Sequence, residues 1–200
     1  MTRIWQRLAV AAVSGLMLTG VVQCNALKQK PGDKCVSNGK FQCTNPSTAL
    51  LCQSGTLVNM PCRGPNGCQG VGPGSQCDDD LGQVGEPCLS DPSGENYACG
   101  TDMKSELVCQ SGKWALASTC KGPGGCRVAG LVVHCDDDFA DVGDACISSA
   151  SDANYSCTPD KKAMVVCTAD KFNMWEACTG PHGCHIENNL VYCDGAKKPR

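Results

Sequence analysis

Residues 109–126 read CQSGKWALASTCKGPGGC, and this stretch decides the fold. An apolar run ends at Cys109, a turn and an aromatic residue follow, and Gly-Pro-Gly-Gly lies between Cys120 and Cys126. These are the third, fourth and fifth cysteines of a group of six, and the chain holds three such groups. The groups are Cys35, Cys43, Cys52, Cys62, Cys68 and Cys77; Cys88, Cys99, Cys109, Cys120, Cys126 and Cys135; and Cys146, Cys157, Cys167, Cys178, Cys184 and Cys193.

The spacing of the cysteines is nearly the same in all three groups. The second and third groups have 10, 9, 10, 5 and 8 residues between successive cysteines, and the first has 7, 8, 9, 5 and 8. An even number of cysteines at a fixed period is the signature of a disulfide framework copied in tandem. The sequence therefore predicts three cysteine-rich modules: module 1 (27–80), module 2 (81–138) and module 3 (139–200), which includes a basic tail.

The N-terminal residues are typical of an export signal. Residues 1–7 carry two arginines and no acidic residue, and an apolar run follows from Leu8 to Val22. This run is shorter than the ~20 residues of a membrane-spanning helix, and its position after a basic segment is that of a secretory signal. We therefore expect residues 1–26 to be a signal peptide and exclude them from the fold.

The nineteenth cysteine, Cys24, lies where the apolar run stops. A bacterial lipoprotein has its lipidated cysteine at this place, although Gln23 replaces the small residue that normally precedes it. The alternative is cleavage after Ala26, which removes Cys24 with the signal. The first route gives a peripheral lipid anchor and the second a secreted protein, and both stay open. Either route brings the other eighteen cysteines into an oxidising compartment, where thiols pair.

The composition favours covalent stabilisation over a large core. Aromatic residues make up 4% of the chain, and a module of ~45 residues buries too little surface to fold without staples. Closing a loop of ~10 to 40 residues contributes ~3–4 kcal/mol in the chain-entropy model, so three bridges decide whether a module folds. The formal charge of −3 argues against a nucleic-acid partner.

Two short β-hairpins are expected in each module, which makes the predicted fold class small, disulfide-rich and all-β. The first hairpin joins the apolar run before the third cysteine to a return strand through a tight turn, such as Ser111–Gly112. Leu57, Trp114 and Phe172 share a repeat position on that return strand, and we expect them in the module core. The second hairpin turns at Gly72–Pro73, Gly130–Leu131 and Asn188–Asn189.

The second hairpin also suggests a disulfide pairing. A two-residue turn would place the fifth cysteine of each module directly opposite the sixth. We therefore predict that these two cysteines pair, although six cysteines allow 15 connectivities. The predicted pairs are Cys68 with Cys77, Cys126 with Cys135, and Cys184 with Cys193.

No set of residues indicates catalysis, so we expect a non-enzymatic protein without a cofactor. The three histidines, His134, His182 and His185, do not recur between modules, and no nucleophile, base and orienting residue form a recognisable set. His182 and His185 flank Cys184, but a metal site is disfavoured because this thiol is expected in a disulfide.

Two acidic triplets follow the first two modules, at Asp78–Asp80 and Asp136–Asp138. Clustered carboxylates raise the hypothesis of a calcium site. However, the triplets lack the spaced ligands of a calcium-binding loop, and module 3 keeps only Asp194. A solvated acidic linker is therefore the favoured interpretation, and no metal is expected.

Trp175 is the favoured candidate for a ligand contact. An exposed tryptophan can stack on a sugar ring, and Trp175 aligns with Met60 and Ala117, so the repeat does not require an aromatic residue there. A role in the core or as a cover of the module is nevertheless preferred over a ligand contact. The first loops differ between modules and are expected to form contact surface; they are 36–42, 89–98 and 147–156.

The modules resemble the tandem cysteine-rich repeats of predicted secreted proteins and lipoproteins of the bacterial cell envelope. The resemblance rests on the export signal, on residues 107–114 (LVCQSGKW) and on Gly-Pro-x-Gly between Cys120 and Cys126. It implies a non-enzymatic structural or adhesion-type protein, secreted or lipid-anchored in the cell envelope, with an extracellular protein or a polysaccharide as its partner. The alternative is a secreted ligand binder that recognises a glycan or inhibits a protease.

Overall fold

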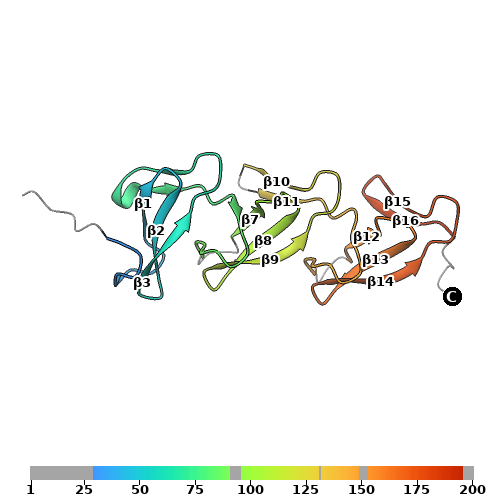
Figure 1. Cartoon of the computed structure of the whole chain (residues 1–200). Coiled ribbons are helices and arrows are strands. Elements are labelled where there is room, and N and C mark those ends of the chain that lie inside the picture. The colour runs from blue at the N-terminus through green and yellow to red at the C-terminus, as the bar shows by residue number, and fades with distance from the viewer. Residues whose placement is uncertain (1–28, 91–95, 131, 149–152, 196–200) are drawn as a thin grey trace, which may run out of the picture.

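The computed structural model describes residues 29–90, 96–130, 132–148 and 153–195. The expected signal peptide, the lipidation candidate Cys24 and the basic tail lie outside the described residues. Three units of similar build follow one another in a row (Figure 1). Within the described part of the chain, no helix has the length and the apolar character needed to span a membrane.

Each unit contains three antiparallel strands that pair in their order along the chain, and in module 2 a further short strand, paired in parallel, makes the sheet four-stranded. The last two strands form the expected first hairpin, and both central residues of its turn have positive φ, at 51° for Ser54 and 74° for Gly55. This is the geometry of a type I′ turn, whose twist matches that of the paired strands. The sheets are β1 (Phe41–Asn45), β2 (Thr48–Gln53) and β3 (Thr56–Pro61); β7 (Tyr97–Gly100), β8 (Ser105–Gln110) and β9 (Lys113–Thr119); and β12 (Tyr155–Cys157), β13 (Ala163–Thr168) and β14 (Lys171–Ala177).

The first strand of each sheet is not among the predicted elements. It carries the second cysteine, and its residues belong to the segment that the sequence presents as the end of a variable loop. In module 3 this strand is only Tyr155–Cys157. A strand of three residues shows too little alternation of apolar and polar side chains to be recognised from its sequence.

The second hairpin is present in each unit with the predicted register. Its strands are β4 (Cys68–Gln69) with β5 (Gln76–Cys77), β10 (Cys126–Ala129) with β11 (Val132–Cys135), and β15 (Cys184–Glu187) with β16 (Leu190–Cys193). The fifth cysteine lies opposite the sixth in all three. In module 1 the predicted two-residue turn at Gly72–Pro73 is wrong, because a 3-10 turn, η1 (Gly72–Gly74), forms part of a longer connection.

Among the described residues, nine disulfides each join two cysteines of the same group, in the order first to third, second to fifth and fourth to sixth. They are Cys35–Cys52, Cys43–Cys68, Cys62–Cys77, Cys88–Cys109, Cys99–Cys126, Cys120–Cys135, Cys146–Cys167, Cys157–Cys184 and Cys178–Cys193. The cysteine-rich, disulfide-bonded, all-β character is therefore confirmed. Such a set of disulfides is typical of a protein of an oxidising compartment.

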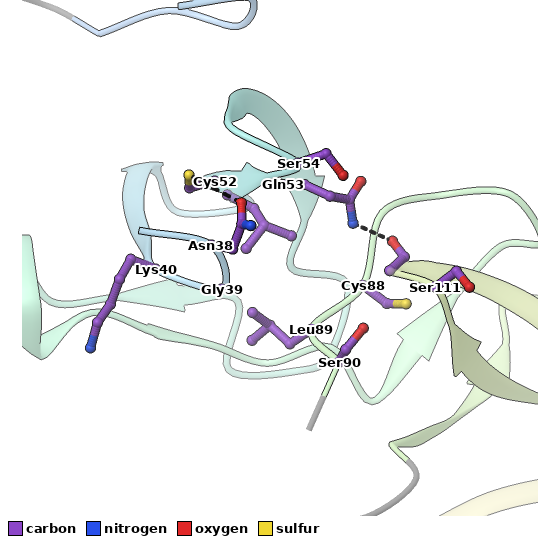
Figure 2. A pocket seen from close by; sticks show the side chains of 12 residues that line it. Asn38, Gly39, Lys40, Cys52, Gln53, Ser54, Cys88, Leu89, Ser90 and Ser111 are labelled. Carbon is purple, nitrogen blue, oxygen red and sulfur yellow. Dashed lines mark hydrogen bonds between the residues drawn. The ribbon is translucent and has the colours of Figure 1, made fainter. Parts of the chain in front are cut away.

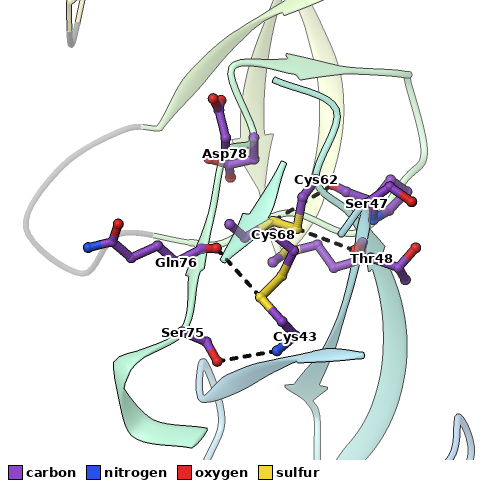
Figure 3. Close-up of a disulfide and its surroundings, with 12 residues drawn as sticks. Cys43, Ser47, Thr48, Cys62, Cys68, Ser75, Gln76 and Asp78 are labelled. Atoms are coloured by element: carbon purple, nitrogen blue, oxygen red, sulfur yellow. Dashed lines mark hydrogen bonds between the residues drawn. A yellow bond between two sulfur atoms is a disulfide. The ribbon is translucent and has the colours of Figure 1, made fainter. Parts of the chain in front are cut away.

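The predicted pairing of the fifth cysteine with the sixth is wrong, for Cys68 with Cys77 as for Cys126 with Cys135 and Cys184 with Cys193. In module 1 the sulfur atoms of Cys62, Cys68 and Cys77 all lie within 4.8 Å of one another, so strand register alone does not select the partner. Cys68 of the hairpin bonds to Cys43 on strand β1 (Figure 3), and Cys77 bonds to Cys62, which directly follows strand β3 on the other edge of the sheet. Two disulfides thus fasten the hairpin to the sheet, whereas the predicted bond would have left it unattached.

The core of each unit is divided between the two faces of its sheet. In module 2 one cluster holds Cys88, Ala98, Leu107 and Trp114, and the other holds the two disulfides that fasten the hairpin. Trp114 is 3% exposed, and Leu57 and Phe172 are 5% and 0% exposed at the same repeat position. The prediction that these three residues form the module core is confirmed.

The chain that follows each acidic triplet becomes part of the next sheet. The short strand β6 (Leu81–Gly82) pairs in parallel with β7, and Phe139 forms an isolated parallel bridge to Cys157 at the corresponding place in module 3. The units are therefore continuous at their joints, and the boundaries at 80 and 138 remain predictions.

Candidate functional site

The first aspartate of each triplet closes the turn between the fourth and fifth cysteines. The Oδ2 atom of Asp78 accepts a hydrogen bond from the backbone N–H of Asn66 at 2.9 Å. Equivalent bonds run from Gly124 to Asp136 at 2.7 Å and from His182 to Asp194 at 3.1 Å. This aspartate is part of the Gly-Pro-x-Gly turn, which explains why it recurs in module 3.

The second aspartate binds the following module. Asp79 Oδ2 accepts a hydrogen bond from Asn96 Nδ2 at 3.1 Å, and Asp137 Oδ2 accepts one from Asn154 Nδ2 at 2.7 Å. Burial raises the pKa of the Asp79 carboxyl, and the hydrogen bond from Asn96 opposes this shift. Module 3 has Gly195 at the equivalent position. The joint aspartate thus occurs only where the described chain forms a joint.

The third aspartate contributes its backbone to the joint. The carbonyl oxygen of Asp80 accepts a hydrogen bond from the N–H of Cys99 at 2.9 Å, and Asp138 accepts one from Cys157 at 3.1 Å. The interpretation of the triplets as solvated linkers is therefore wrong for the first two aspartates, whose carboxylates have partners at fixed places, whereas the third is held through its backbone and Asp138 is exposed. The partners are amide groups, and they give the aspartates a role that does not depend on a metal.

Ion pairs at equivalent repeat positions also connect neighbouring modules. Arg63 binds Glu86 through two contacts, with Nη2 2.5 Å from Oε1 and Nε 3.1 Å from Oε2. At the next joint, Lys121 Nζ lies 2.5 Å from Asp141 Oδ2 and 2.6 Å from Asp144 Oδ2. A single surface ion pair adds little stability, but a two-point contact restricts the angle between its partners.

The two joints also differ in a contact between their strands and turns. At the first joint, Gln53 Nε2 donates a hydrogen bond to the carbonyl oxygen of Gly112 at 2.6 Å (Figure 2). At the second joint, the N–H of Thr119 donates to the carbonyl oxygen of Ala145 at 3.1 Å. Because Pro61 stands at the position of Thr119 in module 1 and has no N–H, the second kind of contact cannot form at the first joint.

Trp175 occupies a β-bulge on strand β14. Val165 pairs with Met174 and Met164 pairs with Glu176, so Trp175 is the extra residue between them. Ala117 is the extra residue in module 2, whereas strands β2 and β3 of module 1 pair without a break. The alignment of Trp175 with Met60 is therefore wrong. The bulge also explains why module 1 has one residue fewer between its third and fourth cysteines.

The side chain of Trp175 is accessible from solvent. It is 57% exposed, and its ring meets Tyr155 edge-on, with 5.6 Å between the ring centroids. Bulges redirect side chains, and here the bulge presents a tryptophan that the other two modules lack. Trp175 therefore remains a candidate ligand contact.

The cysteine and histidine candidates for metal binding have other partners. Among the described residues, the one group of three potential ligands close enough to share an ion is Cys62, Cys68 and Cys77, and all three are in disulfides. His185 stacks on Tyr192, with 5.6 Å between ring centroids. Cys184, between the two histidines, is bonded to Cys157.

The residues that connect the modules were not predicted from the sequence, although the sequence contains a signal for them. Asn96 and Asn154 both precede the second cysteine of their module by three residues, whereas module 1 has Lys40 there. An asparagine that recurs only after an acidic triplet is the pattern expected of two residues that contact each other. Of the variable first loops, residues 91–95 and 149–152 lie outside the described residues.

No protein-family model matches the chain, and neither a curated protein nor a solved structure matches it.

Proposed function

We propose that the chain is an exported, non-enzymatic protein of the bacterial cell envelope, with a structural or adhesive role. Its disulfides support an oxidising compartment. The observation that carries the proposal is the repetition of the same contacts at both joints. A flexible tether, which only has to span a distance, would not need fixed hydrogen-bonding partners for its aspartates.

The joint contacts favour a stiff array. Flexible linkers are rich in glycine and serine and make few contacts. At each joint of this protein, an Asp–Asn hydrogen bond, a backbone hydrogen bond and an ion pair act within one short segment. Three points of contact fix the direction of the next module, so the array serves to hold its far end at a set distance. In the lipid-anchored form, Cys24 places module 3 farthest from the membrane.

Stiffness is tested by small-angle X-ray scattering on the purified oxidised chain. We expect the wild type to fit a single elongated shape, and the double variant Arg63→Ala/Asn96→Ala to need a mixture of bent shapes. The control is Thr179→Ala/Lys40→Ala, which changes the equivalent repeat positions outside a joint. A wild type that already needs the same mixture would contradict the proposal.

Export is tested by fractionating cells and measuring the mass of the mature N-terminus. A diacylated Cys24 indicates the lipid anchor, and an N-terminus at Leu27 indicates free secretion. Recovery of the chain from the cytosol with free thiols would rule out the proposed compartment.

A secreted ligand binder is the second candidate, and the exposure of Trp175 favours it. An aromatic side chain on a rigid bulge can stack on the apolar face of a sugar or occupy a pocket of a protease. A polysaccharide array and a protease panel separate these two ligands. Loss of either activity in Trp175→Ala would assign it to this residue.

A further inference from the structure

A groove of about 550 Å³ lies between modules 1 and 2. The loop before β1 and the β2–β3 turn form one wall, while residues 88–90 and the β8–β9 turn form the other (Figure 2). Small-molecule sites commonly have volumes of ~300–1,000 Å³ and occur preferentially where domains meet. This groove therefore has the size and the place of a binding site.

The contact that forms the groove is specific to the first joint. Gln53 reaches Gly112 across it, and a Cβ atom on Gly112 would lie 2.1 Å from Gln53 Nε2. Only glycine allows this approach, and module 3 has Asp170 at the equivalent position. This contact therefore distinguishes the first joint from the second, where Asp170 replaces the glycine.

The groove combines uncharged polar side chains with the apolar side chain of Leu89. Asn38, Ser90 and Ser111 line it and provide amide and hydroxyl groups, and the partly buried Leu89 provides apolar surface. Leu51 is 2% exposed and belongs to the core cluster on which Leu89 packs, so it supports the groove from below.

Charge limits the class of ligand that fits. Lys40 is the one charged residue among those that line the groove, and its side chain points away from Leu89 and Ser90 (Figure 2). A cationic ligand would meet no opposite charge among the lining residues. An anionic ligand would meet only Lys40, whose ammonium group is directed away from Leu89 and Ser90 (Figure 2), so the loss of its hydration would be poorly compensated. Sugar hydroxyls both donate and accept hydrogen bonds, as the amides and hydroxyls of the groove do, and sugar C–H groups can pack on leucine.

We propose that this groove binds a neutral oligosaccharide, so that modules 1 and 2 together form a recognition site for an extracellular polysaccharide. The inference deepens the proposed function and rests on it, because the groove exists only while the two modules are held together. It is separate from the candidate contact at Trp175, which belongs to module 3.

Titration calorimetry on the full oxidised chain tests the site. The probes are neutral tetrasaccharides of glucose, mannose, xylose and N-acetylglucosamine. We expect one of them to bind, and Leu89→Trp, which fills the groove, to weaken that binding by about tenfold or more. The matched control is Ile147→Trp, at the same repeat position of the second joint, which should keep the wild-type affinity.

Several outcomes would overturn the assignment. These are no binding of any of the four probes, an equal loss in Ile147→Trp, or a loss in Trp175→Ala with full binding in Leu89→Trp. Binding of an acidic oligosaccharide in place of the neutral ones would also overturn it. Small-angle X-ray scattering from the same samples shows whether the modules are still held in a stiff array. The test therefore distinguishes failure of the groove proposal from failure of the proposed stiff array.

Discussion

The carboxylate of Asp78 fills the space that a side chain on Gly64 would need. A Cβ atom on Gly64 would lie 1.6 Å from Asp78 Oδ1, and one on Gly122 would lie 1.7 Å from the equivalent atom of Asp136. Asp78 cannot simply move away, because it holds both the backbone N–H and the side-chain amide of Asn66. The glycine before the proline is therefore required by the aspartate that closes the turn.

Gly64→Ala should lower the stability of the chain by ~1–3 kcal/mol, since the added methyl group breaks the Asp78 hydrogen bonds or strains the turn. Thermal unfolding followed by circular dichroism measures the effect. Gly74→Ala is the control in the same module, because a Cβ atom there meets nothing within 4 Å. Equal melting temperatures for the two variants would show that the close approach has no energetic consequence.

The disulfide pattern can be checked in module 2 by mass spectrometry of unreduced peptides. Trypsin cuts after Lys121 and Arg127 and so separates Cys120, Cys126 and Cys135, and a second protease that cleaves before aspartate simplifies the larger fragments. We expect Cys126 to be linked to Cys99, and Cys120 to Cys135. A peptide that links Cys126 to Cys135 would restore the pairing that the sequence suggests.

Glu106 should make the stability depend on pH. Burial, and then the charge of Asp137, raise the pKa of this carboxyl, and its side chain lies on β8 with the residue only 8% exposed. A raised pKa in the folded state means that stability is highest below the ordinary pKa of glutamate and falls as the pH rises through the raised value.

Glu106→Gln removes that charge and should raise the melting temperature at pH 7 by ~2–4 °C, the shift that ~1 kcal/mol produces in a chain of this size. The gain should disappear below about pH 4, where the wild-type carboxyl is neutral in both states. The exposed Glu187→Gln serves as the control. A gain that stays constant from pH 4 to pH 8 would argue against this origin.

Replacement of the two tryptophans of the return strands should destabilise the chain to very different extents. Trp114→Ala removes a buried ring and should destabilise the chain by ~3–5 kcal/mol. Trp175→Ala loses only the edge contact with Tyr155, for which ~0.5–1.5 kcal/mol is expected. Denaturant unfolding of both variants measures the difference, and a comparable loss for the two would mean that Trp175 is also part of the core.

Most of each module could be predicted because its signals are local. The glycine and serine turns, the apolar run before Cys109 and the aromatic position of Trp114 all act within about ten residues, and the hairpins formed where these signals occur. The strand around Cys157 could not be predicted, because its three residues are ordered by pairing with β13 rather than by their own pattern. The cysteine spacing shows that the segment around Trp175 has one residue more than its counterpart in module 1, but only the strand register identifies which residue is the extra one.

The sequence by itself determined that this protein is a disulfide-rich all-β chain, since the number and period of its cysteines, the tight turns and the small aromatic content leave few other folds. It also determined which cysteines face each other across the second hairpin. Only the tertiary structure decided the partners of those cysteines, because the sulfur atoms of Cys62, Cys68 and Cys77 all lie within 4.8 Å of one another and the packing of the hairpin on the sheet selects the bonds. The same holds at the joints, where Asp79 and Asn96 meet only after both modules have folded.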